Sequence, residues 1–193
     1  MFNIFTPTGS NPPTVQVGQY YQGGIVGYIL QPGDPGYVAD FQHGLIISET
    51  TPPLTVDFPS GWPWTMRNVP PLPNLTSLSS AIGTGQSNTN TIVAANDYGG
   101  NPAIYDPAKE CDVYSSNGYS DWYLPSLNEL IAMGANRALL PNWMTYWSST
   151  QQSQDYAYAV NGSTNATLTE LKWGVNIGPP YGPYYRYRPT RSF

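Results

Sequence analysis

The feature that most constrains this chain is the stretch of residues 118–126, which reads GYSDWYLPS. It joins an aromatic, strand-like segment to the strongest helix start in the sequence. Ser126 precedes Glu129 at the spacing of a capping box, and Pro125 keeps the backbone extended just before the cap. Apolar residues then recur on one helical face at Leu127, Leu130, Ile131 and Leu139. The stretch therefore predicts a helix that serves as the hub for the surrounding strands.

The composition favours one turn-rich domain. A chain of 193 residues is long enough for one domain of ordinary size, and we divide it into an N-terminal arm, residues 1–19, and a domain, residues 20–193. Charged residues make up only 10% of the chain, against about a quarter in typical soluble proteins. The 19 glycines, 20 prolines and 16 tyrosines indicate a β-rich module of extracellular type with many turns.

Charge and residue counts exclude several kinds of site. A net charge of -5 argues against a nucleic-acid partner, because phosphate binding needs a concentrated cationic face. One cysteine, Cys111, excludes an intramolecular disulfide, and we expect it to be a buried, inert thiol. One histidine, His43, leaves no histidine cluster for a metal. No apolar run reaches the ~20 residues of a membrane span. We expect no membrane insertion, no bound metal and no cofactor.

Two groups of charged residues leave alternatives open. Arg186, Arg188 and Arg191 gather near the C-terminus, where they form either a local basic patch or, as we favour, ion pairs that lock the chain end. Asp34 and Asp40 lie in a Pro- and Gly-rich connector, where they either ligate calcium or, more commonly for isolated loop aspartates, cap turns.

Short strands separated by turns account for much of the chain. Residues 20–30 and 43–48 are rich in β-branched and aromatic residues, and they predict an antiparallel pair. Asn161-Gly162 is typical of a hairpin turn. Further strands are predicted at residues 146–150, 156–161, 168–175 and 184–193, the last of them tucked into the sheet.

The remaining segments predict helices and one long loop. Residues 82–90 are rich in glycine but lack the ending of a phosphate-binding loop, so we expect them to lead into a helix through residues 92–95. A second helix is predicted at residues 106–114, with Asn117-Gly118 as its stop. The Pro-rich residues 50–80 form a long loop, in which Trp62 and Trp64 either stack on sugar rings or anchor the loop to the body.

Several fragments together resemble the Lcl C-terminal domain family, named for the C-terminal domain of a bacterial collagen-like adhesin and found in bacterial surface proteins and phage structural proteins. The fragments are YQGGIV (21–26), QPGDPGY (31–37), HGLI (43–46), IGTGQSNT (82–89), GYSDWYLPS (118–126), YWSS (146–149) and RPTRSF (188–193). The resemblance implies an α+β, C-type-lectin-like domain of short, mostly antiparallel strands with two or three helices and long loops. It implies extracellular binding, often to glycans, with Trp122, Trp147 and Arg191 in structural roles.

The first functional hypothesis is a carbohydrate-binding module. Aromatic faces stack on the CH groups of sugars, and neutral polar side chains bond their hydroxyls. The candidate ligand-binding residues are Tyr156, Tyr158, Trp173, Asn176, Tyr181, Tyr184, Trp62 and Trp64.

The second hypothesis is a virion structural protein of fibre or decoration type, placed on the virion surface. Here the arm attaches the domain to a capsid or tail scaffold through its apolar residues Phe2, Ile4 and Phe5. A phage protein leaves the cell by lysis, which fits an N-terminus without the pattern of a signal peptide. The two hypotheses combine in a homo-oligomeric protein that grips cell-surface glycans. The alternative is an adhesin module that is extracellular or on the bacterial cell surface.

An enzyme, such as one that processes polysaccharides, is the hypothesis that we disfavour. His43 with Ser48 and Asp40 imitates a triad, and Asp121 with Glu129 imitates a carboxylate pair. Neither comes with a nucleophile motif, and the capping box already explains Glu129.

Overall fold

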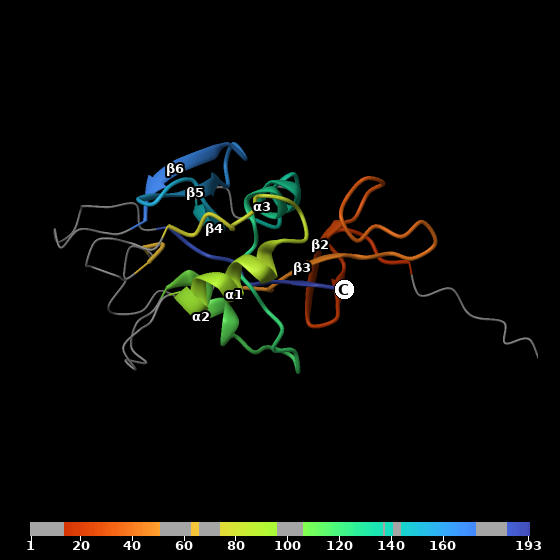
Figure 1. Cartoon of the computed structure of the whole chain (residues 1–193). Helices are drawn as coiled ribbons and strands as arrows, with labels where there is room; N and C mark the ends of the chain where they lie inside the picture. The colour runs from red at the N-terminus through yellow and green to blue at the C-terminus, as the bar shows by residue number, and fades with distance from the viewer. Residues whose placement is uncertain are drawn as a thin grey trace, which may run out of the picture.

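The fold is of the mixed α+β class, with two antiparallel sheets and three helices in the described residues (Figure 1). A computed structural model describes residues 14–50, 63–65, 74–95, 106–136, 138–140, 144–172 and 185–193. The first sheet has the order β1 (Tyr20–Tyr21), β2 (Gly24–Ile29), β3 (Gly44–Ile47) and β7 (Thr190–Ser192). The second has the order β4 (Thr145–Gln151), β5 (Tyr156–Asn161) and β6 (Thr167–Leu171). The helices are α1 (Gly85–Ala95), α2 (Pro107–Asp112) and α3 (Leu127–Gly134). Among these, none is long and apolar enough to cross a membrane.

The strand predicted at residues 20–30 is a two-stranded hairpin instead. Gln22 and Gly23 have φ values of 43° and 88°, so they form a tight turn that joins β1 to β2, with Tyr21 opposite Gly24. A side chain at position 23 is excluded because its Cβ would lie 2.5 Å from the ring of Tyr119. The predicted antiparallel pairing with the strand near residue 45 is confirmed, because β2 pairs with β3.

The end of the chain closes the first sheet. β7 pairs with β3, with Arg191 opposite Ile46, so the prediction of a terminal strand within the sheet is confirmed. The predicted boundary between the arm and the domain, at residue 20, lies after residues that already contact the domain. Val15 is buried and exchanges hydrogen bonds with the side chain of Gln42, and the Gly18 N–H donates to the Val26 carbonyl.

Residues 118–126 connect the two sheets, as expected of a hub. Tyr123 and Thr190 exchange backbone hydrogen bonds of 2.8 and 3.0 Å at the edge of β7. Two residues later, the Pro125 carbonyl accepts from the N–H of Ser149 in β4. The following helix has both hydrogen bonds of the predicted capping box, between Ser126 and Glu129. It ends at Gly134, so Leu139 lies beyond it, although its side chain is buried in the same core.

The second helix begins as predicted and ends earlier. Pro107 is its first residue and the Asp106 side chain caps it, but the helix ends at Asp112. Asn117 and Gly118 do not stop it; they have positive φ values and form a separate tight turn in which Ser116 and Tyr119 pair. Cys111 is buried, as expected, and burial raises the pKa of its thiol well above the ordinary value.

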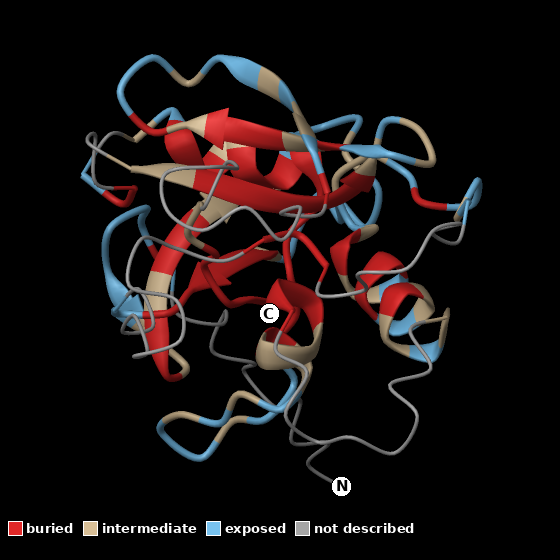
Figure 2. Cartoon of the chain, turned by 90° about the vertical axis from the view of Figure 1, so that its left-hand side faces the viewer, coloured by how far each residue is buried: buried red, intermediate tan, exposed pale blue. Residues whose placement is uncertain are grey.

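Two hydrophobic clusters cover opposite faces of the second sheet. Trp147 and Ala159 point into the cluster on the side of α1 and α2, whereas Tyr146 and Val160 point into the cluster shared with α3 and the first sheet. This alternation follows from the side-chain period of two in a strand. Figure 2 shows the resulting arrangement, in which buried strands run through the centre and exposed segments lie around it.

The carboxylate of Glu129 ties the starts of two helices together. Its Oε2 accepts from the Ser126 N–H at 2.8 Å, and its Oε1 accepts from the N–H groups of Gly83 at 2.9 Å and Gly85 at 3.4 Å, just before and at the start of α1. A Cβ on Gly85 would lie 2.3 Å from this carboxylate. The glycine-rich stretch therefore surrounds an anionic side chain of the same chain. Burial raises the pKa of Glu129, and these N–H groups oppose that rise.

We predict that Glu129→Gln lowers the free energy of unfolding by about 1–3 kcal/mol, because an amide NH2 then faces a buried N–H that the carboxylate had accepted. Chemical denaturation measures this loss. Asn128→Ala is the control, since the Asn128 side chain is exposed on the same turn, and it should change stability by no more than about 0.5 kcal/mol. Equal stability of Glu129→Gln and the wild type would contradict the role given to the carboxylate.

Candidate ligand-binding surface

One face of the β5–β6 hairpin carries tyrosines and threonines together. In the register of the hairpin, Tyr156 lies opposite Leu171, Tyr158 opposite Thr169, and Val160 opposite Thr167. Directly opposed residues of an antiparallel pair share a face. Tyr156 and Leu171 are 40% and 37% exposed, both threonines are exposed, and Tyr158 is half-buried. We call the surface of Tyr156, Tyr158, Thr167, Thr169 and Leu171 the tyrosine face.

The opposite face of the hairpin holds this surface in place. Ala157 and Ala159 are fully buried against the core that contains Trp147. Next to them, the carboxylate of Glu170 accepts a hydrogen bond of 2.9 Å from the hydroxyl of Tyr185. The small alanines let the strand lie close to the core, so the tyrosine face sits on a rigid support rather than on a loop.

The chemistry of the tyrosine face is neutral and amphipathic. It offers aromatic ring area from Tyr156 and Tyr158, hydroxyl groups from the tyrosines and threonines, and no charged side chain. Such a surface stacks on apolar ring faces and exchanges hydrogen bonds with hydroxyls. It lacks a charged partner for an anion or a metal ion.

The predicted ligand-binding residues divide into three groups. The structure brings Tyr156 and Tyr158 together on one surface, because alternate residues of the confirmed strand at residues 156–161 share a face. Trp64 lies in the core at 3% exposure, which is the arrangement of the loop-anchoring alternative. The other predicted residues lie outside the described part of the chain: Trp62, Trp173, Asn176, Tyr181, Tyr184, and the arm residues Phe2, Ile4 and Phe5.

Three residues of the tyrosine face were missed by sequence reasoning: Thr167, Thr169 and Leu171. Their alternation with Leu168 and Glu170 indicates that the three residues share one face of a strand. Whether that face is the one with Tyr156 and Tyr158 depends on the register of the hairpin. The hairpin turn expected at Asn161-Gly162 is confirmed, and it is longer than two residues, because the Asn161 N–H donates to the carbonyl of Ala166 and Asn165 takes a φ of 59°. The longer turn sets which residues face the tyrosines.

A buried lysine anchors the end of β6. The Nζ of Lys172 donates to the Gln151 side chain and to the Gln154 carbonyl, and it lies 4.9 Å from the ring centre of Trp64. The indole N–H of Trp64 donates to the Ser148 carbonyl at 2.7 Å. Burial lowers the pKa of Lys172 from its ordinary 10.5 to about 8. These contacts of Lys172 and Trp64 hold residues 63–65 against the second sheet.

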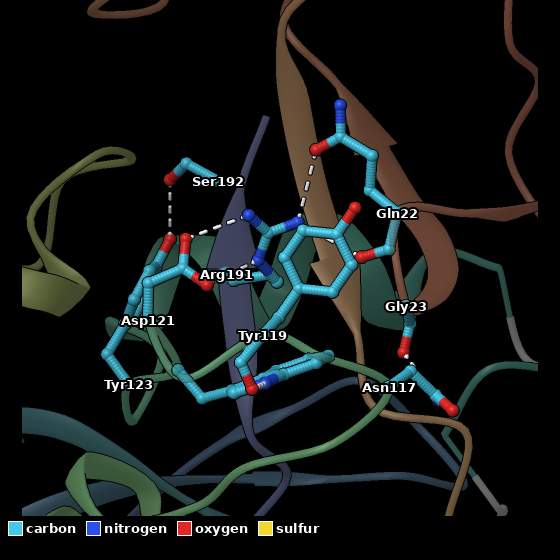
Figure 3. Close-up of polar contacts among 9 residues, drawn as sticks. Gln22, Gly23, Asn117, Tyr119, Asp121, Tyr123, Arg191 and Ser192 are labelled. Atoms are coloured by element: carbon cyan, nitrogen blue, oxygen red, sulfur yellow. Dashed lines mark hydrogen bonds and ion pairs between the residues drawn. The ribbon is translucent and has the colours of Figure 1, made fainter.

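A cluster of polar side chains surrounds Arg191 (Figure 3). Its Nε and Nη2 donate to the two carboxylate oxygens of Asp121 at 2.7 and 2.8 Å, and its Nη1 donates to the carbonyl and side-chain oxygens of Gln22. The guanidinium lies 4.1 Å from the ring centre of Tyr119. This hydrogen bonding lowers the pKa of Asp121. Because neighbours occupy the guanidinium, the cluster locks β7 to the β1–β2 turn rather than offering a site.

The other C-terminal arginines also hold the chain end to neighbouring segments. Arg188 is buried and donates to the carbonyls of Ser48 and Glu49 at 2.7 and 3.0 Å. Arg186 is half-buried and lies beside β4, where its backbone bonds to Thr145 and Trp147. Arg191 fits the favoured expectation, because it forms an ion pair with Asp121.

Asp34 of the connector holds one of its turns. Both the hydroxyl of Tyr28 and the backbone N–H of Gln31 donate to Oδ2 of Asp34, at 2.8 and 2.7 Å. Asp34 therefore acts as a turn cap, which is one of the two roles weighed for it. No group of three or more His, Cys, Asp or Glu side chains lies within metal-binding range in the described residues.

The residues that imitate catalytic groups have separate structural partners. Asp121 is paired with Arg191, and Glu129 holds the helix starts. Ser48 is buried and its hydroxyl donates to the Thr50 carbonyl. His43 lines a hollow of about 360 Å³ with Ser192 and Phe193, and its Nδ1 lies 3.2 Å from the Phe193 carbonyl oxygen. No aspartate or glutamate is among the described residues that line this hollow.

Comparison with known proteins identifies no family. No protein-family model matches the chain, and no curated protein matches it.

Lys172 gives a pH-dependent prediction. Because its pKa is about 8 in the folded protein, the unfolded chain binds more protons at this lysine between about pH 8 and 10. The contribution of Lys172 to the free energy of unfolding therefore rises with pH there by up to about 1.4 kcal/mol per pH unit, while the buried Cys111 thiol, whose pKa is raised, contributes in the opposite direction. Denaturation of the wild type and of Lys172→Met at pH 7.5 and 9.5 measures the contribution as the difference between the two proteins. Lys109→Met, a control in α2, should follow the wild type. An equal change of stability with pH in the wild type and Lys172→Met would contradict the shifted pKa of Lys172.

Proposed function

We propose that this chain is a virion surface structural protein of fibre or decoration type, and that its lectin-like domain binds host or environmental glycans on the tyrosine face. The observation that carries the proposal is the exposure of Tyr156 beside Leu171, with threonine hydroxyls on the same supported face. A ring held in this way stacks on the apolar face of a sugar and loses little conformational freedom on binding.

The absence of charge on the tyrosine face favours a neutral ligand. The chain carries a net charge of -5, so an anionic polysaccharide meets a repulsive background field, whereas a neutral sugar does not. The hydroxyls of Thr167 and Thr169 both donate and accept hydrogen bonds, which suits the hydroxyl groups of neutral glycans.

The resemblance to the Lcl C-terminal domain family supports both parts of the proposal, since that family occurs in adhesins and in phage structural proteins. The arm attaches the domain to a capsid or tail scaffold through Phe2, Ile4 and Phe5. The second candidate is an adhesin module on a bacterial surface, which the same resemblance favours.

Removing residues 1–13 distinguishes attachment to a scaffold from glycan binding, because Val15 and its bonds to Gln42 remain and hold the rest of the domain as it is. The truncated protein should no longer bind the scaffold and should still bind the glycan.

We predict that Tyr156→Ala weakens glycan binding about tenfold or more, the equivalent of about 1.4 kcal/mol. A glycan array with densely immobilised sugars identifies the ligand, and biolayer interferometry then compares the variants. Tyr37→Ala is the matched control, because Tyr37 is a similarly exposed tyrosine in another segment. Both variants should melt within a few degrees of the wild type, since surface substitutions change stability little.

Two results would contradict glycan binding on this face. The first is a wild-type protein that binds no sugar on the dense array. The second is Tyr156→Ala binding as tightly as Tyr37→Ala and the wild type, which would move the ligand to another surface.

A further inference from the structure

The outer edge of β6 has backbone groups that the described fold leaves unpaired. The Asn161 N–H donates to the Ala166 carbonyl, and the Lys172 N–H donates to the Asp155 carbonyl. In an antiparallel pair, only alternate residues bond to the same neighbour. The backbone groups of Leu168 and Glu170 therefore bond to β5. The backbone N–H and C=O groups of the alternate residues, Thr167, Thr169 and Leu171, point away from β5, toward the outer edge of the sheet. No described residue bonds to those groups.

This edge lacks the features that usually prevent strand pairing. Natural edge strands carry lysines, prolines or bulges that keep other strands away. β6 reads TLTEL, without lysine or proline, and it pairs with β5 over five consecutive residues without a register shift. Thr167, Thr169 and Leu171 are also exposed. The edge is thus straight, accessible and able to accept a further strand.

We propose that β6 pairs with β6 of a second copy of this chain, antiparallel about a two-fold axis at Thr169. The pairing is self-complementary, because Thr169 meets Thr169 of the other copy and each Leu171 meets a Thr167. All three positions have outward backbone groups on both copies, so the pairing forms about six hydrogen bonds. It joins the two three-stranded sheets, one from each copy, into one six-stranded antiparallel sheet.

The charges of β6 suit a second copy. Glu170 is the only charged residue in the strand, and it lies on the face opposite the tyrosine face, bonded to the Tyr185 hydroxyl. In the two-fold register, Glu170 lies opposite Leu168 of the other copy, so the two glutamates are diagonal neighbours rather than directly opposed residues. An isologous dimer of this kind closes on itself and exposes no further β6 edge.

The dimer also extends the tyrosine face. Opposed residues share a face, so the side chains of Thr167, Thr169 and Leu171 from both copies lie beside each other. The two tyrosine faces then form one continuous surface, which increases avidity for a repetitive ligand. The pairing itself does not depend on glycan binding, and its test does not involve sugar.

The test is the mass of the full chain in solution, measured by light scattering and native mass spectrometry over a concentration series. Thr169→Pro removes the central outward N–H but none of the bonds to β5, because proline is tolerated on the free side of an edge strand. We expect a wild-type dimer at micromolar concentration and at least tenfold weaker association of Thr169→Pro. Thr169→Val, which keeps both the N–H and the β-branched shape, should dimerise like the wild type.

Hydrogen exchange of the wild type gives an independent result if Thr169→Pro fails to fold. The amides of Thr167, Thr169 and Leu171 should be protected in concentrated solution and exchange quickly on dilution, while those of Leu168 and Glu170 stay protected throughout. A monomeric wild type, or a dimer unaffected by Thr169→Pro, would overturn the proposal. Edge amides that stay protected at every dilution would also overturn it, because another part of the same chain would then cover the edge.

Discussion

A buried carboxylate, that of Glu129, fixes how the helices meet the sheets. The first N–H groups of a helix have no partner within it, and burying them unpaired is costly. Glu129 accepts hydrogen bonds from the N–H group at the start of its own helix and from N–H groups of the loop that begins α1. One side chain therefore satisfies the starts of both helices. The Ser126 hydroxyl, which caps the same helix, donates to the Ala81 carbonyl and adds a further link to that loop. The positions of α1 and α3 are therefore coupled.

This coupling extends to the candidate ligand-binding surface through β4. The Ser149 N–H donates to the Pro125 carbonyl, and the Leu127 N–H donates to the Thr150 hydroxyl, so the start of α3 holds the strand directly. β4 in turn pairs with β5, which carries Tyr156 and Tyr158. The tyrosine face is thus connected to the helix cap by hydrogen bonds within ordered elements, and this rigidity reduces the entropy lost when a ligand is bound.

Local sequence signals predicted the elements, and long-range contacts decided their details. The capping box of α3 and the proline at the start of α2 act within one helical turn, so both were readable. The turn at Gln22 and Gly23 was missed because the surrounding residues suit a strand on either side. Of the tyrosine face, the sequence indicated Tyr156 and Tyr158 as candidates by their aromatic side chains. Trp64 shows the limit of this reasoning, since an indole suits a sugar platform and a core equally, and only the Ser148 carbonyl beside it distinguishes the two.

The alternation in β5 separates stability from recognition along a single strand. Ala157 and Ala159 meet the core, where added volume would strain a close-packed interior. Tyr156 lies exposed on the other face of the strand, where a substitution changes few contacts with the protein and, under the proposed glycan binding, a contact with the ligand. Tyr158 is intermediate, because it also packs against the cluster around α3. The proposal therefore predicts that substitutions at Tyr156, Thr167 and Thr169 change ligand specificity at little loss of stability, whereas a substitution at Tyr158 affects both.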